Sequence, residues 1–182
     1  MKQLGLMIDM ARCIGCKTCI VACQNNHGLV DNESALPGEI PYYLRVEVKR
    51  EGTYPNIKAI SRVVPCQHCK NPPCVKACKA KAISKDPETG IVRIDRKKCK
   101  GAKACIEACP YGVIQFDNKN KFAHKCDLCF DRVHIGEEPV CAEVCMTDAI
   151  VFGELALLKQ KAKNEGRKVD RKMSAQNILY VS

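Results

Sequence analysis

Fifteen cysteines in a chain of 182 residues constrain its fold more than any other feature of the sequence. Their number is odd, so complete pairing into intramolecular disulfides is impossible. They fall into four groups, and each group ends in two cysteines separated by three residues. The groups are Cys13, Cys16, Cys19 and Cys23; Cys66, Cys69, Cys74 and Cys78; Cys99, Cys105 and Cys109; and Cys126, Cys129, Cys141 and Cys145. No cysteine lies outside a group, so the sequence repeats one sulfur-rich motif four times.

The spacing within the groups indicates iron-sulfur clusters. In the C-x2-C-x2-C-x3-C group that begins at Cys13, three sulfurs can surround a compact inorganic cube. The last two cysteines of each group lie one helical turn apart, and the tail cysteine points toward a neighbouring cluster, as in two-cluster ferredoxins. Zinc also binds C-x2-C pairs, but a structural zinc site needs two such pairs or a mixture with histidine. We therefore favour iron-sulfur clusters over zinc.

Histidine adds little to this ligand set. There are four histidines, and one of them, His68, lies inside a cysteine group. We interpret His68 as a hydrogen-bonding or packing residue beside a cluster rather than as a ligand.

A second repeat predicts short strands and a ferredoxin-like α+β fold. After three of the four tail cysteines, the chain continues through three residues to an apolar residue followed by isoleucine. These pairs are Ala82-Ile83, Val113-Ile114 and Ala149-Ile150. The segment IVRID at 91–95 follows the turn-forming stretch KDPETG, so we expect it to form a hairpin with the first of these strands.

The segments outside the motifs also carry patterns. YYLRVEVKRE (42–51) and IKAISRVV (57–64) alternate as paired strands do, and LVDNESALPGEIP (29–41) is typical of a loop. ELALLKQKAKNEG (154–166) predicts a helix with a basic face that stops at glycine, and NILYVS (177–182) predicts an edge strand. No apolar run is long enough to cross a bilayer, so we expect no membrane span in this chain. No apolar leader is found either, which favours a cytoplasmic location.

The net charge of +10 first suggests nucleic-acid binding, but the clusters offer a better explanation. A cubane core of charge about +2 held by four thiolates is about −2 overall, so four clusters contribute about −8. Much of the lysine and arginine excess then compensates the chain's own cofactors. Aromatic residues make up only 5% of the sequence, which leaves few rings for base stacking. We therefore expect no nucleic-acid partner.

The string CQHCKNPPC (Cys66 to Cys74), with cysteine quartets on both sides, resembles the four-cluster iron-sulfur subunits of molybdopterin oxidoreductases. Such subunits occur in the dimethyl sulfoxide, polysulfide, nitrate and formate enzymes. The resemblance spans Met1 to Phe152, from the strand-like opening of KQLGLMIDMARCIGCKTCIVAC to CAEVCMTDAI. It implies two nested ferredoxin-like units with an inserted β-hairpin and a core dominated by clusters. The implied divisions are 1–32 with 124–153, the hairpin region 33–62, the second unit 63–123, and a C-terminal extension 154–182.

The resemblance also implies which cysteines share a cluster, because three cysteines of one motif join the tail cysteine of its mate. Three 4Fe-4S clusters would use Cys13, Cys16, Cys19 and Cys145; Cys126, Cys129, Cys141 and Cys23; and Cys66, Cys69, Cys74 and Cys109. The fourth would use Cys99, Cys105 and Cys78, with its last ligand at position 102, which is alanine. Since a methyl group has no lone pair, we expect a 3Fe-4S cluster there. The alternative is a 4Fe-4S cube whose fourth iron takes water, hydroxide or another residue.

The function that the resemblance implies is electron transfer, with no bond chemistry performed by this polypeptide. Electrons would pass between a catalytic subunit that carries a molybdenum or tungsten pterin and either a membrane quinone-reactive subunit or a soluble partner. Attachment to the membrane would come through a partner, and a twin-arginine signal on a partner could carry the complex to the periplasm. The alternatives are a hydrogenase-linked polyferredoxin and, in a different class, a zinc or single-cluster structural or regulatory protein.

Overall fold

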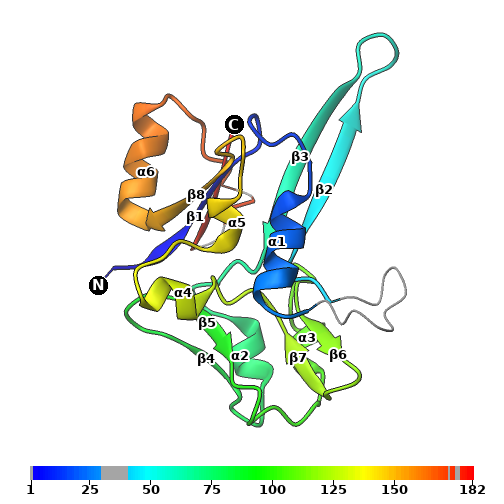
Figure 1. Ribbon diagram of the computed structural model, residues 1–182, viewed down its shortest axis with the longest axis vertical. Helices are drawn as coiled ribbons and strands as arrows, with labels where there is room; N and C mark the ends of the chain where they lie inside the picture. Colours follow the sequence, from blue (N-terminus) through cyan, green and yellow to red (C-terminus); the bar gives the residue numbers. More distant parts are fainter. Residues whose placement is uncertain (1, 30–40, 172, 175–176) are drawn as a thin grey trace.

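The computed structural model describes residues 2–29, 41–171, 173–174 and 177–182, and short helices and strand pairs follow one another along a mixed α/β chain (Figure 1). The helices are α1 (Thr18–Asn26), α2 (Pro73–Ala77), α3 (Ala104–Glu107), α4 (Phe130–His134), α5 (Val140–Glu143) and α6 (Leu155–Asn164). The strands are β1 (Leu4–Asp9), β2 (Leu44–Glu51), β3 (Lys58–Pro65), β4 (Ile83–Lys85), β5 (Val92–Ile94), β6 (Gln115–Asp117), β7 (Phe122–His124), β8 (Ile150–Glu154) and β9 (Ile178–Val181).

The two ends of the chain meet in a three-stranded sheet of order β8-β1-β9. β1 pairs antiparallel with β8 and parallel with β9. Gly5 lies where β1 approaches the C-terminal segment, and a Cβ there would lie 2.1 Å from the carbonyl oxygen of Asn177. The predicted opening strand, C-terminal helix and C-terminal edge strand are therefore confirmed.

Helix α6 covers this sheet with a small core of its own. Leu155, Leu158 and Ala162 are buried on α6 against Met7 of β1 and Leu179 of β9. Lys161 and Lys163 lie in its last turn, near the negative end of the helix dipole. No cysteine belongs to this core, so it is the part of the described chain held by carbon packing alone.

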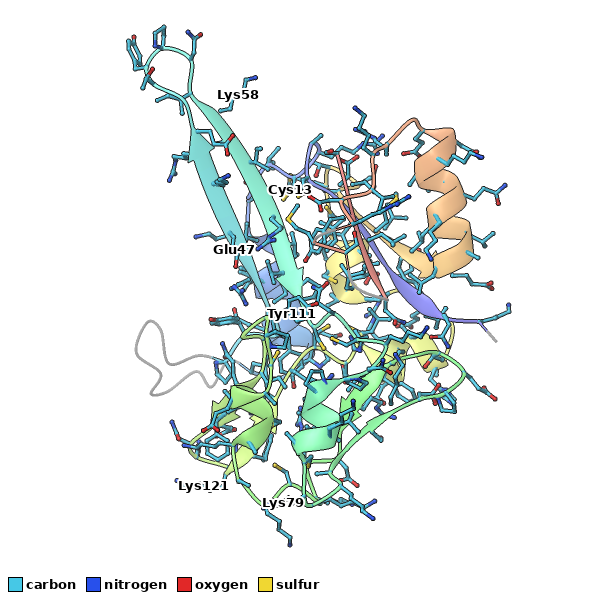
Figure 2. All side chains as sticks on the ribbon, turned by 180° about the vertical axis from the view of Figure 1, so that it is seen from behind. Cys13, Glu47, Lys58, Lys79, Tyr111 and Lys121 are labelled. Carbon is cyan, nitrogen blue, oxygen red and sulfur yellow. The ribbon has the colours of Figure 1, made fainter. Side chains whose placement is uncertain are left out.

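The hairpin β2–β3 projects from the rest of the molecule (Figure 1). Leu44 pairs with Pro65 at its base and Glu51 with Lys58 toward its outer end, which confirms the pairing predicted from the alternating sequence. Figure 2 shows Lys58 near the outer end, with Lys79 and Lys121 at the opposite end of the molecule. Most of the loop predicted at 29–41, and the expected division at 32–33, lie outside the described residues.

Two small hairpins form the lower part of the molecule in Figure 1. β4 pairs with β5 as predicted, and the carboxylate of Asp86 accepts hydrogen bonds from Glu88 N–H and Thr89 N–H in the turn. β6 pairs with β7 through a similar turn at Asp117, and β7 was not expected from the sequence. Two of the three strands expected at the apolar-Ile pairs begin at the isoleucine, β4 at Ile83 and β8 at Ile150. The third, expected at Val113-Ile114, is β6, which begins one residue after Ile114.

Cysteines are structural members of the two remaining cores. The larger core joins β1, β3 and β9 to buried cysteines from all but the third group; these are Cys19, Cys23, Cys66, Cys126, Cys129 and Cys141. The smaller core joins Ile83, Val92 and Ile114 to Cys74 and Cys105. Within the described part of the chain, no helix is both long enough and apolar enough to cross a membrane.

Candidate iron-sulfur sites

The first thiol site lies between the loop before α1 and the loop after α5. Cys13, Cys16, Cys19 and Cys145 line one small cavity of about 20 Å³. Gly15 and Lys17 both adopt the left-handed conformation, which turns the loop tightly enough for its cysteines to face inward. The hairpin covers this loop, because Val46 and Val63 line the same cavity.

The second thiol site lies at the base of β3 and the start of α2. Cys66, Cys69, Cys74 and Cys109 line a second cavity of about 20 Å³. Proline at position 73 begins α2, where its missing N–H breaks no helical hydrogen bond. The sequence CKNPPC therefore turns directly into a helix that presents Cys74 to the cavity.

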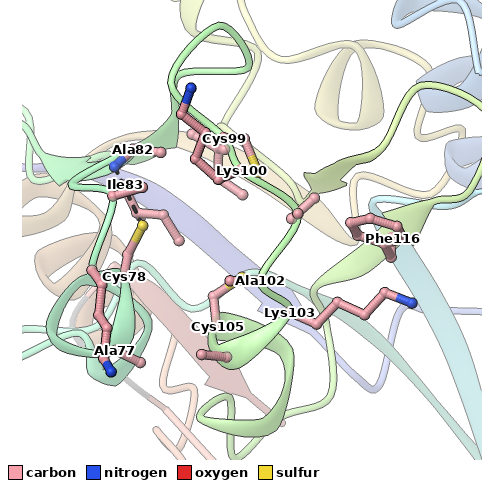
Figure 3. Close-up of a pocket in the computed structure, with 16 residues that line it drawn as sticks. Ala77, Cys78, Ala82, Ile83, Cys99, Lys100, Ala102, Lys103, Cys105 and Phe116 are labelled. Carbon is pink, nitrogen blue, oxygen red and sulfur yellow. Dashed lines mark hydrogen bonds between the residues drawn. The ribbon is translucent and has the colours of Figure 1, made fainter.

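The third thiol site contains only three cysteines and is larger. Cys78, Cys99 and Cys105 line a cavity of about 260 Å³ together with Ala102 (Figure 3). The side chain of Ala102 is solvent-exposed, so the cavity opens to the surface on that side. Lysines surround the opening, and the ammonium of Lys103 lies 4.3 Å from the ring centroid of Phe116. The other lysines that line it are Lys79 and Lys100.

The fourth thiol site is the most deeply buried. Cys23, Cys126, Cys129 and Cys141 are the four remaining thiols, and all of them are buried. Cys23 lies on α1 and Cys141 on α5, and these two helices pack together. Burial raises the pKa of the Cys126 and Cys141 thiols well above the ordinary value, and repulsion from Cys23 adds to both shifts. The Nε2 atom of His27 lies 3.5 Å from the sulfur of Cys129.

The electrostatics of the sites suit a cationic inorganic core. Burial raises the pKa of Cys19 to about 12, and it raises the pKa of Cys74 and of Cys129 to about 11. Thiols crowded in this way ionise at neutral pH only when a positive core compensates them. Cys16 is the exception, because it is exposed and a hydrogen bond from the Thr18 hydroxyl lowers its pKa.

The donor set fits iron-sulfur clusters. All fifteen cysteines are free thiols, and soft sulfur donors are the ligands of such clusters. Within the described residues, no group of three or more histidine, cysteine, aspartate or glutamate side chains converges on a point that could hold one metal ion. The thiols of three of the sites instead line the walls of cavities, as ligands of a multi-iron core do.

Three polar residues beside the second site are buried, Gln67, His68 and Lys125, and Gln67 lines its cavity. His68 has the hydrogen-bonding role expected from the sequence, because its Nδ1 atom accepts a hydrogen bond from Val92 N–H at 2.9 Å. Lys125 is buried as well, which the sequence analysis missed. Its position next to Cys126 is the one sequence feature that could have directed attention to it.

Relatives with similar sequences are components of oxidoreductases. One subunit of the sulfite dehydrogenase of Allochromatium vinosum is 36% identical over 170 residues, which cover 85% of this chain and 70% of the relative. One component of the anaerobic dimethyl sulfoxide reductase of Escherichia coli is 36% identical over 161 residues, which cover 87% of this chain and 77% of the relative. The formate dehydrogenase-O iron-sulfur subunit of Escherichia coli is 33% identical over 171 residues, which cover 88% of this chain and 56% of the relative.

The mixed α/β fold and the thiol-lined sites define a ferredoxin-type iron-sulfur protein. Residues 59–155 match the family described as a 4Fe-4S dicluster domain, and residues 6–26 match a 4Fe-4S binding domain. The polypeptide belongs to the family of 4Fe-4S electron-transfer subunits of molybdopterin oxidoreductases, which confirms the resemblance seen at Cys66–Cys74. Its role is electron transfer within a multisubunit oxidoreductase, and it is not the catalytic subunit.

Proposed function

We propose that the chain is a relay of four iron-sulfur clusters between a molybdenum- or tungsten-pterin catalytic subunit and a membrane quinone-reactive or soluble partner. The observation that carries this proposal is the exchange of tail cysteines between groups. Cys145 lines the cavity of the first group, and Cys109 lines the cavity of the second. Such exchange places clusters next to one another, as a chain of electron carriers requires.

The ligand sets of the relay follow from this exchange. Three 4Fe-4S clusters are bound by Cys13, Cys16, Cys19 and Cys145; by Cys126, Cys129, Cys141 and Cys23; and by Cys66, Cys69, Cys74 and Cys109. The shared cavities support the first and third sets. Mutual repulsion among the four buried thiols supports the second.

These ligand sets are explained by an architecture in which one ferredoxin-like unit is inserted within another. One unit combines 1–32 with 124–153, and the other is 63–123, with the hairpin region 33–62 and the extension 154–182 as additions. The pairing of β1 with β8 supports the outer unit, because it brings the first and last motifs together. The hairpins β4–β5 and β6–β7 support the inner one, because each follows a motif of that unit.

The fourth cluster is a 3Fe-4S cluster bound by Cys99, Cys105 and Cys78. The support is the wide cavity of about 260 Å³ with a methyl group, Ala102, at the position where a fourth thiolate would lie. Loss of one thiolate beside several lysines raises the reduction potential of this cluster above that of its neighbours. A cluster of raised potential at the end of the molecule remote from the hairpin suits electron exchange with a quinone site.

Iron and sulfide analysis of the anaerobically purified protein tests the relay. Three 4Fe-4S clusters and one 3Fe-4S cluster require about fifteen irons per chain. The oxidised protein should show the electron paramagnetic resonance of a 3Fe-4S cluster, because three ferric ions carry an odd number of electrons. One to four irons per chain, or zinc, would contradict the relay. A full iron content without the 3Fe signal would contradict only the nuclearity of the fourth cluster.

A further inference from the structure

Lys125 is buried in the interior, with only 3% of its surface exposed. Lysine is almost never fully buried unless a group of opposite charge accompanies it. The Lys125 ammonium donates hydrogen bonds to two backbone carbonyls, those of Val92 and Cys126, the second at 2.8 Å. It makes no ion pair with a carboxylate within the part of the chain that the structure describes. The described part of the chain therefore gives this positive charge no carboxylate partner.

The position of Lys125 places it between two thiol sites. On one side Val92 lines the cavity of Cys66, Cys69, Cys74 and Cys109. On the other side Cys126, whose carbonyl binds the ammonium, belongs to the deeply buried fourth site. The two sites are neighbours, because the charge of Cys66 adds to the burial that raises the pKa of Cys126. Burial raises the pKa of Cys74 to about 11, and the Lys125 charge opposes that rise.

His68 provides a second and independent observation at the same place. Its Nδ1 atom accepts the N–H of Val92, the residue whose carbonyl binds Lys125, so one backbone residue positions both side chains. A ring whose Nδ1 accepts a hydrogen bond carries its proton on Nε2. His68 is fully buried, and its Nε2 has no hydrogen-bond partner among the described residues. A buried donor of this kind requires an acceptor that the described residues do not supply.

We propose that Lys125 is a positioning residue whose buried charge bridges two adjacent clusters and raises the reduction potentials of both. The inference rests on the relay proposed above and names the residue that tunes its centre. Each cluster becomes more negative by one charge when it accepts one electron, and a fixed ammonium favours that state. The unpartnered His68 Nε2 proton would be available to donate a hydrogen bond to cluster sulfur beside Lys125.

Redox titration followed by electron paramagnetic resonance tests this role in the full chain with its clusters. Lys125→Met removes the charge and keeps the length of the side chain. We expect two of the four clusters to become at least tenfold harder to reduce in the one-electron equilibrium, which is a fall of 59 mV. Lys163→Met is the matched control, because it makes the same change of charge at an exposed position on α6. The control should leave all potentials unchanged, since solvent and salt screen an exposed charge.

Lys125→Arg distinguishes charge from shape. The arginine variant should keep both potentials near their original values, because guanidinium retains the charge. If Lys125→Met loses iron while Lys125→Arg retains it, the iron content itself, rather than a reduction potential, shows that the site requires a buried positive charge. Unchanged potentials in an iron-replete Lys125→Met protein, or equal loss of iron in both variants, would overturn the inference. Wild-type protein without clusters would instead overturn the relay itself.

Discussion

Replacement of Ala102 by cysteine should convert the 3Fe-4S cluster into a 4Fe-4S cluster. Ala102 lines the same cavity as Cys78, Cys99 and Cys105, so a thiol added there faces the incomplete corner of the cluster. The cavity of about 260 Å³ has room for one sulfur and one further iron. Because the side chain of Ala102 is exposed, the substitution should change the free energy of unfolding by no more than about 0.5 kcal/mol.

The expected magnitude is one iron per chain, a rise from about fifteen to about sixteen. That change is small in a total iron assay, so electron paramagnetic resonance is the decisive measurement. The signal of the oxidised 3Fe cluster should disappear completely, because an oxidised 4Fe-4S core has an even number of electrons. The extra thiolate should also lower the reduction potential of this cluster.

The matched control for this substitution is Ala102→Val, which adds similar volume at the same position but no sulfur. It should retain the 3Fe signal and about fifteen irons. If the cysteine variant keeps the full 3Fe signal, position 102 is not the missing corner, and the ligand set of the fourth cluster is wrong. If the valine variant loses the signal too, filling the cavity rather than ligation accounts for the change.

Three further perturbations test the rest of the structure. Glu47→Gln should weaken the hairpin by about 0.5 kcal/mol, since the Glu47 carboxylate binds Arg45 and Arg62, and faster exchange of the hairpin amides would show it. Burial raises the pKa of Glu47, but hydrogen bonds from Arg62 and Arg45 outweigh burial and leave the pKa below its ordinary value. The stabilisation that Glu47 gives the hairpin should therefore persist at neutral pH and fade below about pH 4. Leu158→Ala should destabilise α6 by about 2 to 5 kcal/mol in hydrogen exchange without altering any cluster signal. Anaerobic removal of iron by a chelator should expose the amides of 66–145 first, and equal loss of protection in α6 would contradict the separate core described for it.

Local spacing was sufficient to predict much of this molecule. The C-x3-C pairs fall on or beside short helices because that spacing is one helical turn, as at Cys19 and Cys23. The hairpins β2–β3 and β4–β5 were predicted because alternating residues and a turn segment determine such pairs locally. The expected grouping of cysteines came from the family resemblance, since spacing alone does not say which tail cysteine joins which motif.

Contacts between distant segments could not be predicted from these patterns. The parallel pairing of β1 with β9 joins opposite ends of the chain and has no local sequence pattern. The burial of Lys125 was equally hidden, because lysine is usually exposed and thirty Lys and Arg residues give no reason to single one out. The sequence predicted a missing ligand at position 102 but not the open cavity around Ala102. The width of that cavity depends on how segments from different parts of the chain pack around it.

The position of β1 between β8 and β9 has a consequence for synthesis on the ribosome. β1 must wait for both of its neighbours, which are translated much later. At about 5 to 20 residues per second, that delay lasts on the order of ten to thirty seconds. Throughout it, the apolar side chains of Leu6, Met7 and Ile8 have no sheet to join. A chaperone or partner that covers these side chains during synthesis would shield them until β8 and β9 are available.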